Sequence, residues 1–320
     1  MLVNFFRSDR TVVPITLFLI CFLFQIFSVF TDVDFELIQS QSALQLSIDW
    51  INEIVFVGAT LAVILVFVTT ILIGVLVNSC DITIRKSFLV SFAFLLLSLG
   101  VGEHFFVSIQ SISNLLLVIM LLRLFHLPKS VGAKSIIFDS SGLIGTMSIL
   151  DSGNVFLMII VWVGIVSFKS VTLNDWIISL CGFFLPFLYL IAGLYFFDSL
   201  QEVNNWLPTF SIIKIQDSKY IVLLGMALLF IPALLVFIGN YAQKASIIRK
   251  MLGIVLLLFV ILTVKMIFSG GELSITTILI PTSIVVGLFF DQIKKVIIAE
   301  SLVLLFLAVS SYYYFVAYFS

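Results

Sequence analysis

The chain has 320 residues, of which 62% are hydrophobic and only 10% are charged, and its formal net charge is −1. Ordinary soluble domains carry about 25% charged residues, so this composition excludes an ordinary soluble protein and favours one embedded in a membrane. The chain also lacks the clustered basic face with which proteins bind nucleic acid.

The apolar residues form runs that are separated by short polar connections. In chain order the runs cover residues 11–30, 53–77, 87–101, 105–124, 136–150, 155–168, 176–197, 220–239, 251–268, 274–290 and 296–318. A helix of about 20 apolar residues crosses a hydrocarbon core of about 30 Å. We therefore expect an all-α fold: a polytopic transmembrane helix bundle of about 11 spans, in which residues 1–320 form one integral-membrane domain.

Two longer polar connections, 31–52 and 198–219, are too short to bury a core of their own. In the first, apolar residues alternate with polar ones, and this pattern predicts an amphipathic segment on the outer surface of the membrane. The second is predicted to be an outer loop.

Three of the runs are short. Segments 87–101, 136–150 and 155–168 would each form about 21–23 Å of helix, which is less than the thickness of the hydrocarbon core. We expect them to pack as paired hairpins inside the bundle, where neighbouring helices shield their ends. Gly142 and Gly145 would allow close helix approach there. The alternative is that each run is one turn longer than it reads and that the bilayer thins locally.

Charge alternates from one connection to the next. Thirteen of the 16 Lys and Arg residues fall at every second connection, and acids dominate the connections between them. Because basic residues near span ends stay on the cytoplasmic side, the alternation predicts an N-terminus inside and a C-terminus outside. We expect a multi-pass membrane protein with this orientation.

The sequence contains no phosphate-binding glycine loop, nucleophile elbow or His-Glu-x-x-His motif. What remains is a group of ionisable residues that the topology assigns to the outer face. The candidate catalytic residues are Asp32, Asp34, Glu103, His104 and Asp151. Carboxylates that converge from separate loops can bind a divalent cation, or one of them can act as a general base. A divalent cation is therefore a possible cofactor, although the residues do not identify one.

Lys265 and Glu272 are the candidate substrate-binding residues of this outer group. Lys265 lies near the outer end of its span, where a cation could hold a phosphate group. The simpler expectation is that its long side chain extends to the membrane surface, because a lysine at mid-depth costs about 2.5–3.5 kcal/mol.

Several short motifs resemble an uncharacterised family of polytopic inner-membrane proteins from Bacteroidota, a domain of unknown function. The likeness covers most of residues 1–197, and it rests on Phe5-Phe6-Arg7-Ser8, on Leu122–Leu127, on Ile137–Gly145, and on Trp176, Leu180, Gly182 and Pro186. That resemblance implies a multi-pass protein of the bacterial inner (cytoplasmic) membrane, and it implies no activity. A weaker one, to glycosyltransferases of the GT-C fold that use polyprenyl-phosphate sugars, rests on the many spans, the short paired helices and an acid just after the first span. The chain lacks the longer first outer loop and the soluble domain of those enzymes.

The sequence thus leaves open whether the protein is an enzyme. One hypothesis is a GT-C-like lipid-linked sugar transferase or envelope-glycan enzyme, whose partners would be membrane lipids and a polyprenyl-phosphate-linked donor. The other is a non-enzymatic scaffold or coupling subunit that binds other envelope membrane proteins. A transporter is disfavoured because no inverted repeat is evident.

Overall fold

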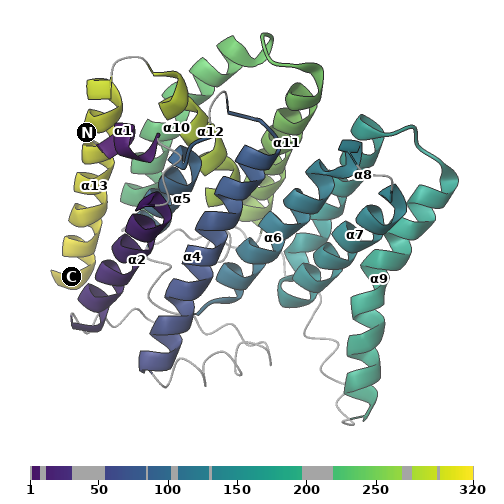
Figure 1. Cartoon of the computed structure of the whole chain (residues 1–320). Coiled ribbons are helices and arrows are strands. Elements are labelled where there is room, and N and C mark those ends of the chain that lie inside the picture. The colour runs from purple at the N-terminus through teal and green to yellow at the C-terminus, as the bar shows by residue number, and fades with distance from the viewer. Residues whose placement is uncertain are drawn as a thin grey trace.

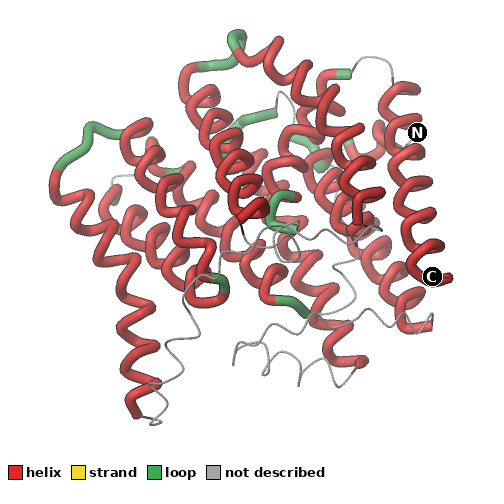
Figure 2. The backbone as a smooth tube through the Cα atoms, turned by 180° about the vertical axis from the view of Figure 1, so that it is seen from behind, coloured by secondary structure: helices red, strands yellow, loops and turns green. Residues whose placement is uncertain are grey.

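The computed structural model describes residues 2–7, 12–30, 55–83, 86–101, 107–129, 132–196, 219–268, 276–293 and 296–319. Within these ranges all regular structure is helical, as Figure 2 shows. The α-helices are α1 (Leu2–Phe6), α2 (Val12–Phe30), α4 (Val55–Ser79), α5 (Leu89–Val101), α6 (Ile109–Phe125), α7 (Ala133–Leu150), α8 (Met158–Phe168), α9 (Leu173–Phe196), α10 (Lys219–Tyr241), α11 (Ser246–Phe268), α12 (Leu279–Gln292) and α13 (Val296–Phe319). Two 3₁₀ helices join them, η1 (Leu127–Lys129) and η2 (Ser152–Leu157).

Apart from α1, which no predicted run covers, the helices coincide with the predicted apolar runs to within about five residues, and the all-α prediction is confirmed for the described part of the chain. Most of them run side by side along one common direction (Figure 1). Three helical stretches in that part are long and apolar enough to cross a membrane: Val57–Ser79, Leu173–Phe196 and Ser246–Met266. The predicted surface segment 31–52 lies outside the described residues, as does 198–218.

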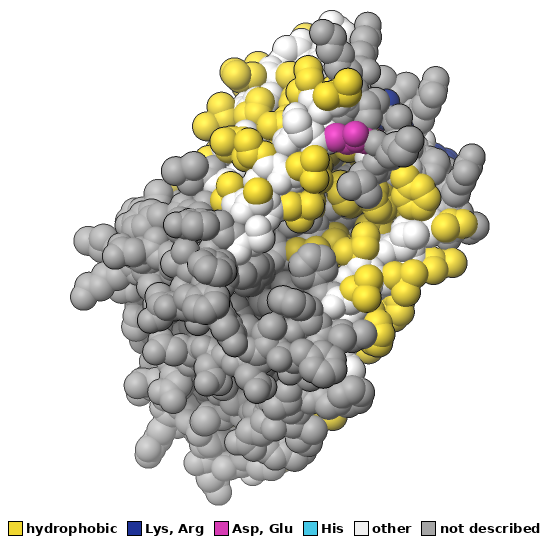
Figure 3. Space-filling model, turned by 90° about the vertical axis from the view of Figure 1, so that its left-hand side faces the viewer, with side chains coloured by type: hydrophobic (Ala, Val, Ile, Leu, Met, Phe, Trp, Pro, Cys, Tyr) yellow, Lys and Arg dark blue, Asp and Glu magenta, His cyan; other side chains and the backbone are white. Residues whose placement is uncertain are grey.

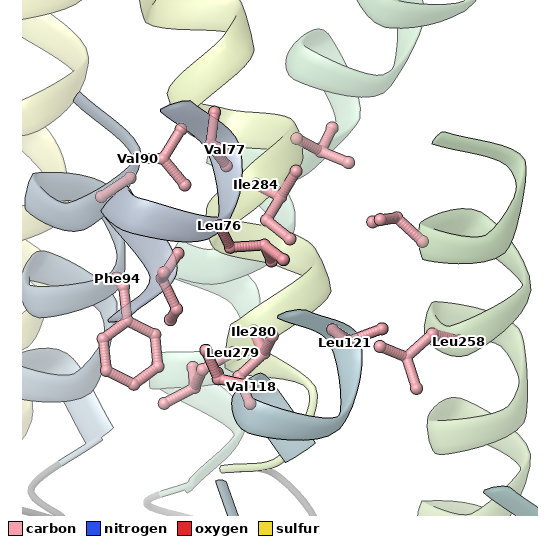
Figure 4. Packing of buried hydrophobic residues seen from close by; sticks show 14 of the residues in the cluster. Leu76, Val77, Val90, Phe94, Val118, Leu121, Leu258, Leu279, Ile280 and Ile284 are labelled. Carbon is pink, nitrogen blue, oxygen red and sulfur yellow. The ribbon is translucent and has the colours of Figure 1, made fainter. Parts of the chain in front are cut away.

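Two short helices, α5 and α12, form the centre of the bundle and pack against each other. Every residue from 89 to 100 and from 279 to 290 is buried, so neither helix presents a face to the surroundings. Their contact depends on Gly287, because a Cβ atom at that position would lie only 2.6 Å from the Val90 Cα. Figure 4 shows the surrounding apolar side chains, with Leu76 of α4 and Val118 of α6 among them.

The prediction about short, shielded segments is therefore confirmed for 87–101 only in part. α5 has 13 residues and is shielded, but its main partner is α12 rather than a neighbour in the chain. α7 begins at Ala133 and has 18 residues, so it is about one turn longer than the predicted segment 136–150, as the alternative expects, and its main partners are α9 and α6. α8 is short, with 11 residues, but Ile159 and Val166 on it are exposed, so its neighbours do not shield it completely.

Small residues set the contact between α7 and α9, and the close helix approach predicted for Gly142 and Gly145 is confirmed. A Cβ atom on Gly142 would lie 3.5 Å from the Gly182 carbonyl oxygen, and one on Gly182 would lie 2.6 Å from the Phe138 carbonyl oxygen. A substitution at Gly145 would likewise meet the α9 backbone at Phe183. These glycines let the two helix backbones approach closely.

The sides of the bundle are apolar. Figure 3 shows the side that carries α2 and α13, where hydrophobic side chains dominate the described surface. Leu23 of α2, Leu304 of α13, Leu235 of α10 and Leu188 of α9 are each at least 60% exposed. An apolar surface that extends around several helices is characteristic of proteins that are covered by lipid or by a partner.

At one end of the bundle, basic side chains donate hydrogen bonds to carbonyl groups at the carboxyl ends of helices. Arg7 Nη2 donates to the carbonyl oxygens of Phe290, Asp291 and Ile293 at 2.9, 3.1 and 3.1 Å, at the end of α12. Lys244 Nζ donates to the Ile82 carbonyl, after α4, and Lys250 Nζ donates to the Ser167 carbonyl, in α8. Cations at these positions bind free carbonyl groups and complement the helix dipole. We call this the basic end.

Candidate functional site

At the opposite end of the bundle, a tight turn follows α7. Asp151 ends α7 and caps η2: its Oδ1 accepts a hydrogen bond from the Gly153 backbone N–H at 3.0 Å. The Asn154 backbone N–H donates to the Asp151 carbonyl oxygen at 2.9 Å, and the Asn154 Nδ2 donates to the Met147 carbonyl oxygen at 3.0 Å. Because the side-chain Nδ2 of Asn154 is bonded to α7, the Oδ1 of the same amide points away from α7.

Lys265, in the last turn of α11, inserts its ammonium group into this turn. Its Nζ donates to Asp151 Oδ2 at 2.5 Å and to Asn154 Oδ1 at 2.6 Å. Gly153 makes room for the lysine, since a Cβ atom there would lie 2.8 Å from Lys265 Cε. One turn and one side chain, 114 residues apart in the sequence, therefore form a single charged cluster.

The burial of the two partners is unequal. The Lys265 side chain is 2% exposed, whereas the Asp151 side chain is 19% exposed. A lysine ammonium has three N–H donors, of which the described residues accept two. The expectation that Lys265 extends to the membrane surface is wrong, because an acidic and an amide partner already hold its ammonium inside the protein.

A second group of polar side chains lies on the first turns of α6, which begin at the same end. Ser108 caps this helix and accepts a hydrogen bond from the Ser111 backbone N–H. Ile109, one residue into the helix, packs in one small apolar cluster with Leu150, which precedes Asp151. Asn114 Nδ2 donates to the Thr276 carbonyl oxygen at 3.2 Å, which connects α6 to the turn before α12.

Several polar atoms of this group are buried without a hydrogen-bond partner among the described residues. They are Gln110 Nε2, Ser113 Oγ, Asn114 Oδ1 and Thr276 Oγ1. A buried polar atom without a hydrogen-bond partner costs about 1–3 kcal/mol of stability. Four such atoms together would destabilise the fold considerably unless another group forms hydrogen bonds with them. We call these four residues the polar row.

Two of the seven predicted site residues lie in the described part of the chain. The structure brings Asp151 and Lys265 into direct contact. Asp32, Asp34, Glu103, His104 and Glu272 lie outside the described residues, so their predicted convergence stays a prediction. Among the described residues, no group of three or more His, Cys, Asp or Glu side chains could hold a metal ion.

Sequence reasoning missed Gly153 and Asn154. The only signal was the polar run Asp151-Ser152-Gly153-Asn154 between two apolar runs, which is typical of an ordinary turn. It also missed Gln110 and Asn114 as site residues, because polar side chains in an apolar helix predict only that the residues face inward.

The comparisons with known proteins add no relative. No family model matches the chain, and neither the curated proteins nor the solved structures contain a match.

Proposed function

We propose that the chain is a multi-pass protein of the bacterial inner membrane, with 11 spans, the N-terminus inside and the C-terminus outside. The apolar sides of the bundle support this proposal, and so do the three long apolar helices. The backbones of α10 and α13 reach similar lengths, 23 and 24 residues. Basic connections collect at the end that would face the cytoplasm, so the Lys265 cluster would face the outside.

We further propose that this cluster acts on a lipid-linked sugar phosphate, as in a GT-C-like transferase. The single observation that carries the proposal is the buried Lys265 ammonium, held by Asp151 and Asn154, with a third N–H that no described residue accepts. A fixed, water-poor cation of this kind stabilises the charge that develops on a leaving phosphate.

The proposed reaction uses both charged residues. The Asp151 carboxylate accepts the proton of an acceptor hydroxyl, whose oxygen then bonds to the anomeric carbon of the sugar. The bond between that carbon and the phosphate oxygen breaks, and polyprenyl phosphate leaves with its negative charge beside Lys265. Asp151 suits this role because its side chain keeps some exposure.

The alternative is a non-enzymatic scaffold or coupling subunit that binds other envelope membrane proteins. The observation in its favour is that Asp151 and Lys265 bond to each other, as a purely structural pair between η2 and α11 would. The two functions differ in whether the cluster interacts with any ligand.

Binding of polyprenyl phosphate, and of its hexose derivative, to the full chain in lipid nanodiscs tests the proposal. The wild type should bind both lipids and release the hexose to an acceptor. Lys265→Met should weaken binding at least tenfold, and Asp151→Asn should abolish hexose release while binding remains. Lys169→Met is the matched control, because Lys169 also pairs with an aspartate, Asp175 at 2.8 Å, but at the basic end. A wild type that binds neither lipid would favour the scaffold.

A further inference from the structure

The polar row is uncharged and combines both kinds of hydrogen-bonding atom. Gln110 Nε2 is a donor, Asn114 Oδ1 is an acceptor, and the hydroxyls of Ser113 and Thr276 can act as either. All four residues are more than nine-tenths buried. The bond from Asn114 Nδ2 to the Thr276 carbonyl fixes which end of that amide remains free.

The helix register places this row at the depth of Lys265. Figure 4 shows Leu121 of α6 and Leu258 of α11 pointing toward each other, and both belong to the same buried cluster. α6 and α11 run in opposite directions, so moving about two turns back along α6 and about two turns forward along α11 leads to the same level. Asn114 lies about two turns before Leu121 on the same face of α6. Lys265 lies about two turns after Leu258 on the same face of α11.

Gln110 lies about one further turn along the same face of α6. Gln110 and Asn114 are therefore both on the side of α6 that faces α11. A carboxylate is missing from the row, so the row suits a neutral ligand rather than a metal ion.

We infer that the polar row binds the hydroxyl groups of a sugar whose phosphate is held by Lys265, an inference that rests on the function proposed above. Sugar hydroxyls donate and accept at once, and they match a buried set of amide and hydroxyl groups without net charge. An amphiphilic donor would thus place its phosphate at the lysine and its sugar ring against α6.

The test compares two lipids and two serine variants of the full chain in nanodiscs. The probes are polyprenyl phosphate and the same lipid carrying one hexose. The wild type should bind the hexose lipid at least tenfold more tightly than the bare phosphate lipid. Ser113→Ala should lose most of that difference and keep its affinity for the bare lipid.

Ser148→Ala is the matched control, because Ser148 is buried too but donates to the Ile144 carbonyl within its own helix. It should leave both affinities unchanged. Thermal unfolding supplies an independent readout: Ser113→Ala removes a hydroxyl without a described partner, so it should not lower the unfolding temperature. A residue with a purely structural role would lower it.

Each outcome decides a different claim. A wild type that binds both lipids equally would overturn the polar-row inference and leave the phosphate site standing. An unchanged hexose preference in Ser113→Ala, or a lower unfolding temperature with it, would also overturn the inference and indicate that ordered water alone satisfies the row. A wild type that binds neither lipid would overturn the proposed function itself.

Discussion

Neutralising Asp151 should destabilise the protein more than removing its partner Lys265. Asp151→Asn keeps an oxygen for the Gly153 N–H but leaves the Lys265 ammonium, whose side chain is 2% exposed, without its counter-charge. Breaking a buried pair in this way costs about 3–5 kcal/mol. Lys265→Met leaves a carboxylate that is 19% exposed and still accepts from Gly153, so we expect a loss of about 1–3 kcal/mol.

The free energy of unfolding of each variant can be measured by titrating the detergent-solubilised chain with a denaturing detergent. The double variant Asp151→Asn/Lys265→Met should be more stable than Asp151→Asn alone, because it no longer contains an unpaired buried ammonium. If Lys265→Met proves at least as damaging as Asp151→Asn, or if the two losses simply add, the unequal burial of the pair does not control its energetics.

Two further predictions concern α12, one for its packing and one for its carboxyl end. Gly287→Ala should lower the free energy of unfolding by about 1–3 kcal/mol, because the new Cβ would lie 2.6 Å from Val90 Cα. Gly239→Ala is the control: its Cβ would meet nothing within 4 Å, so the free energy of unfolding should stay the same or rise by up to about 1 kcal/mol. Equal unfolding temperatures for the two variants would contradict the close α5–α12 contact. Arg7→Gln should lower the free energy of unfolding by about 1.5–3 kcal/mol, because the three bonds from Arg7 to the end of α12 are charge-assisted. Hydrogen exchange should also become faster at the end of α12. Unchanged exchange there would show that Arg7 does not hold that helix end.

The positions of the helices were predictable from the sequence, but their partners were not. An apolar run of suitable length becomes a helix because only a helix satisfies its own backbone in apolar surroundings. Helices such as α5 and α12 are apolar on every side, so no stripe of residues indicates which neighbour each one contacts. Gly287 contacts Val90 across nearly two hundred positions of the sequence, and its local sequence contains no sign of that contact.

The charged residues of the candidate site could be predicted from the sequence, but their arrangement in space could not. Asp151 and Lys265 stood out because charges near apolar runs are rare and costly. Their pairing depends on how η2 packs against α11, which is a tertiary contact. Asn154 completes the cluster through an amide, and a single asparagine beside a glycine reads as an ordinary turn in any sequence.

The orientation of the two ends of the bundle in the membrane decides whether the Lys265 cluster faces the outside. Reporter proteins fused after Arg85, Lys134, Lys250 and Ser152 measure it directly. We expect a cytoplasmic signal at the first three positions and a periplasmic signal at Ser152. A periplasmic signal at any of the first three, or a cytoplasmic signal at Ser152, would contradict the topology and with it the assignment of the site to the outer face.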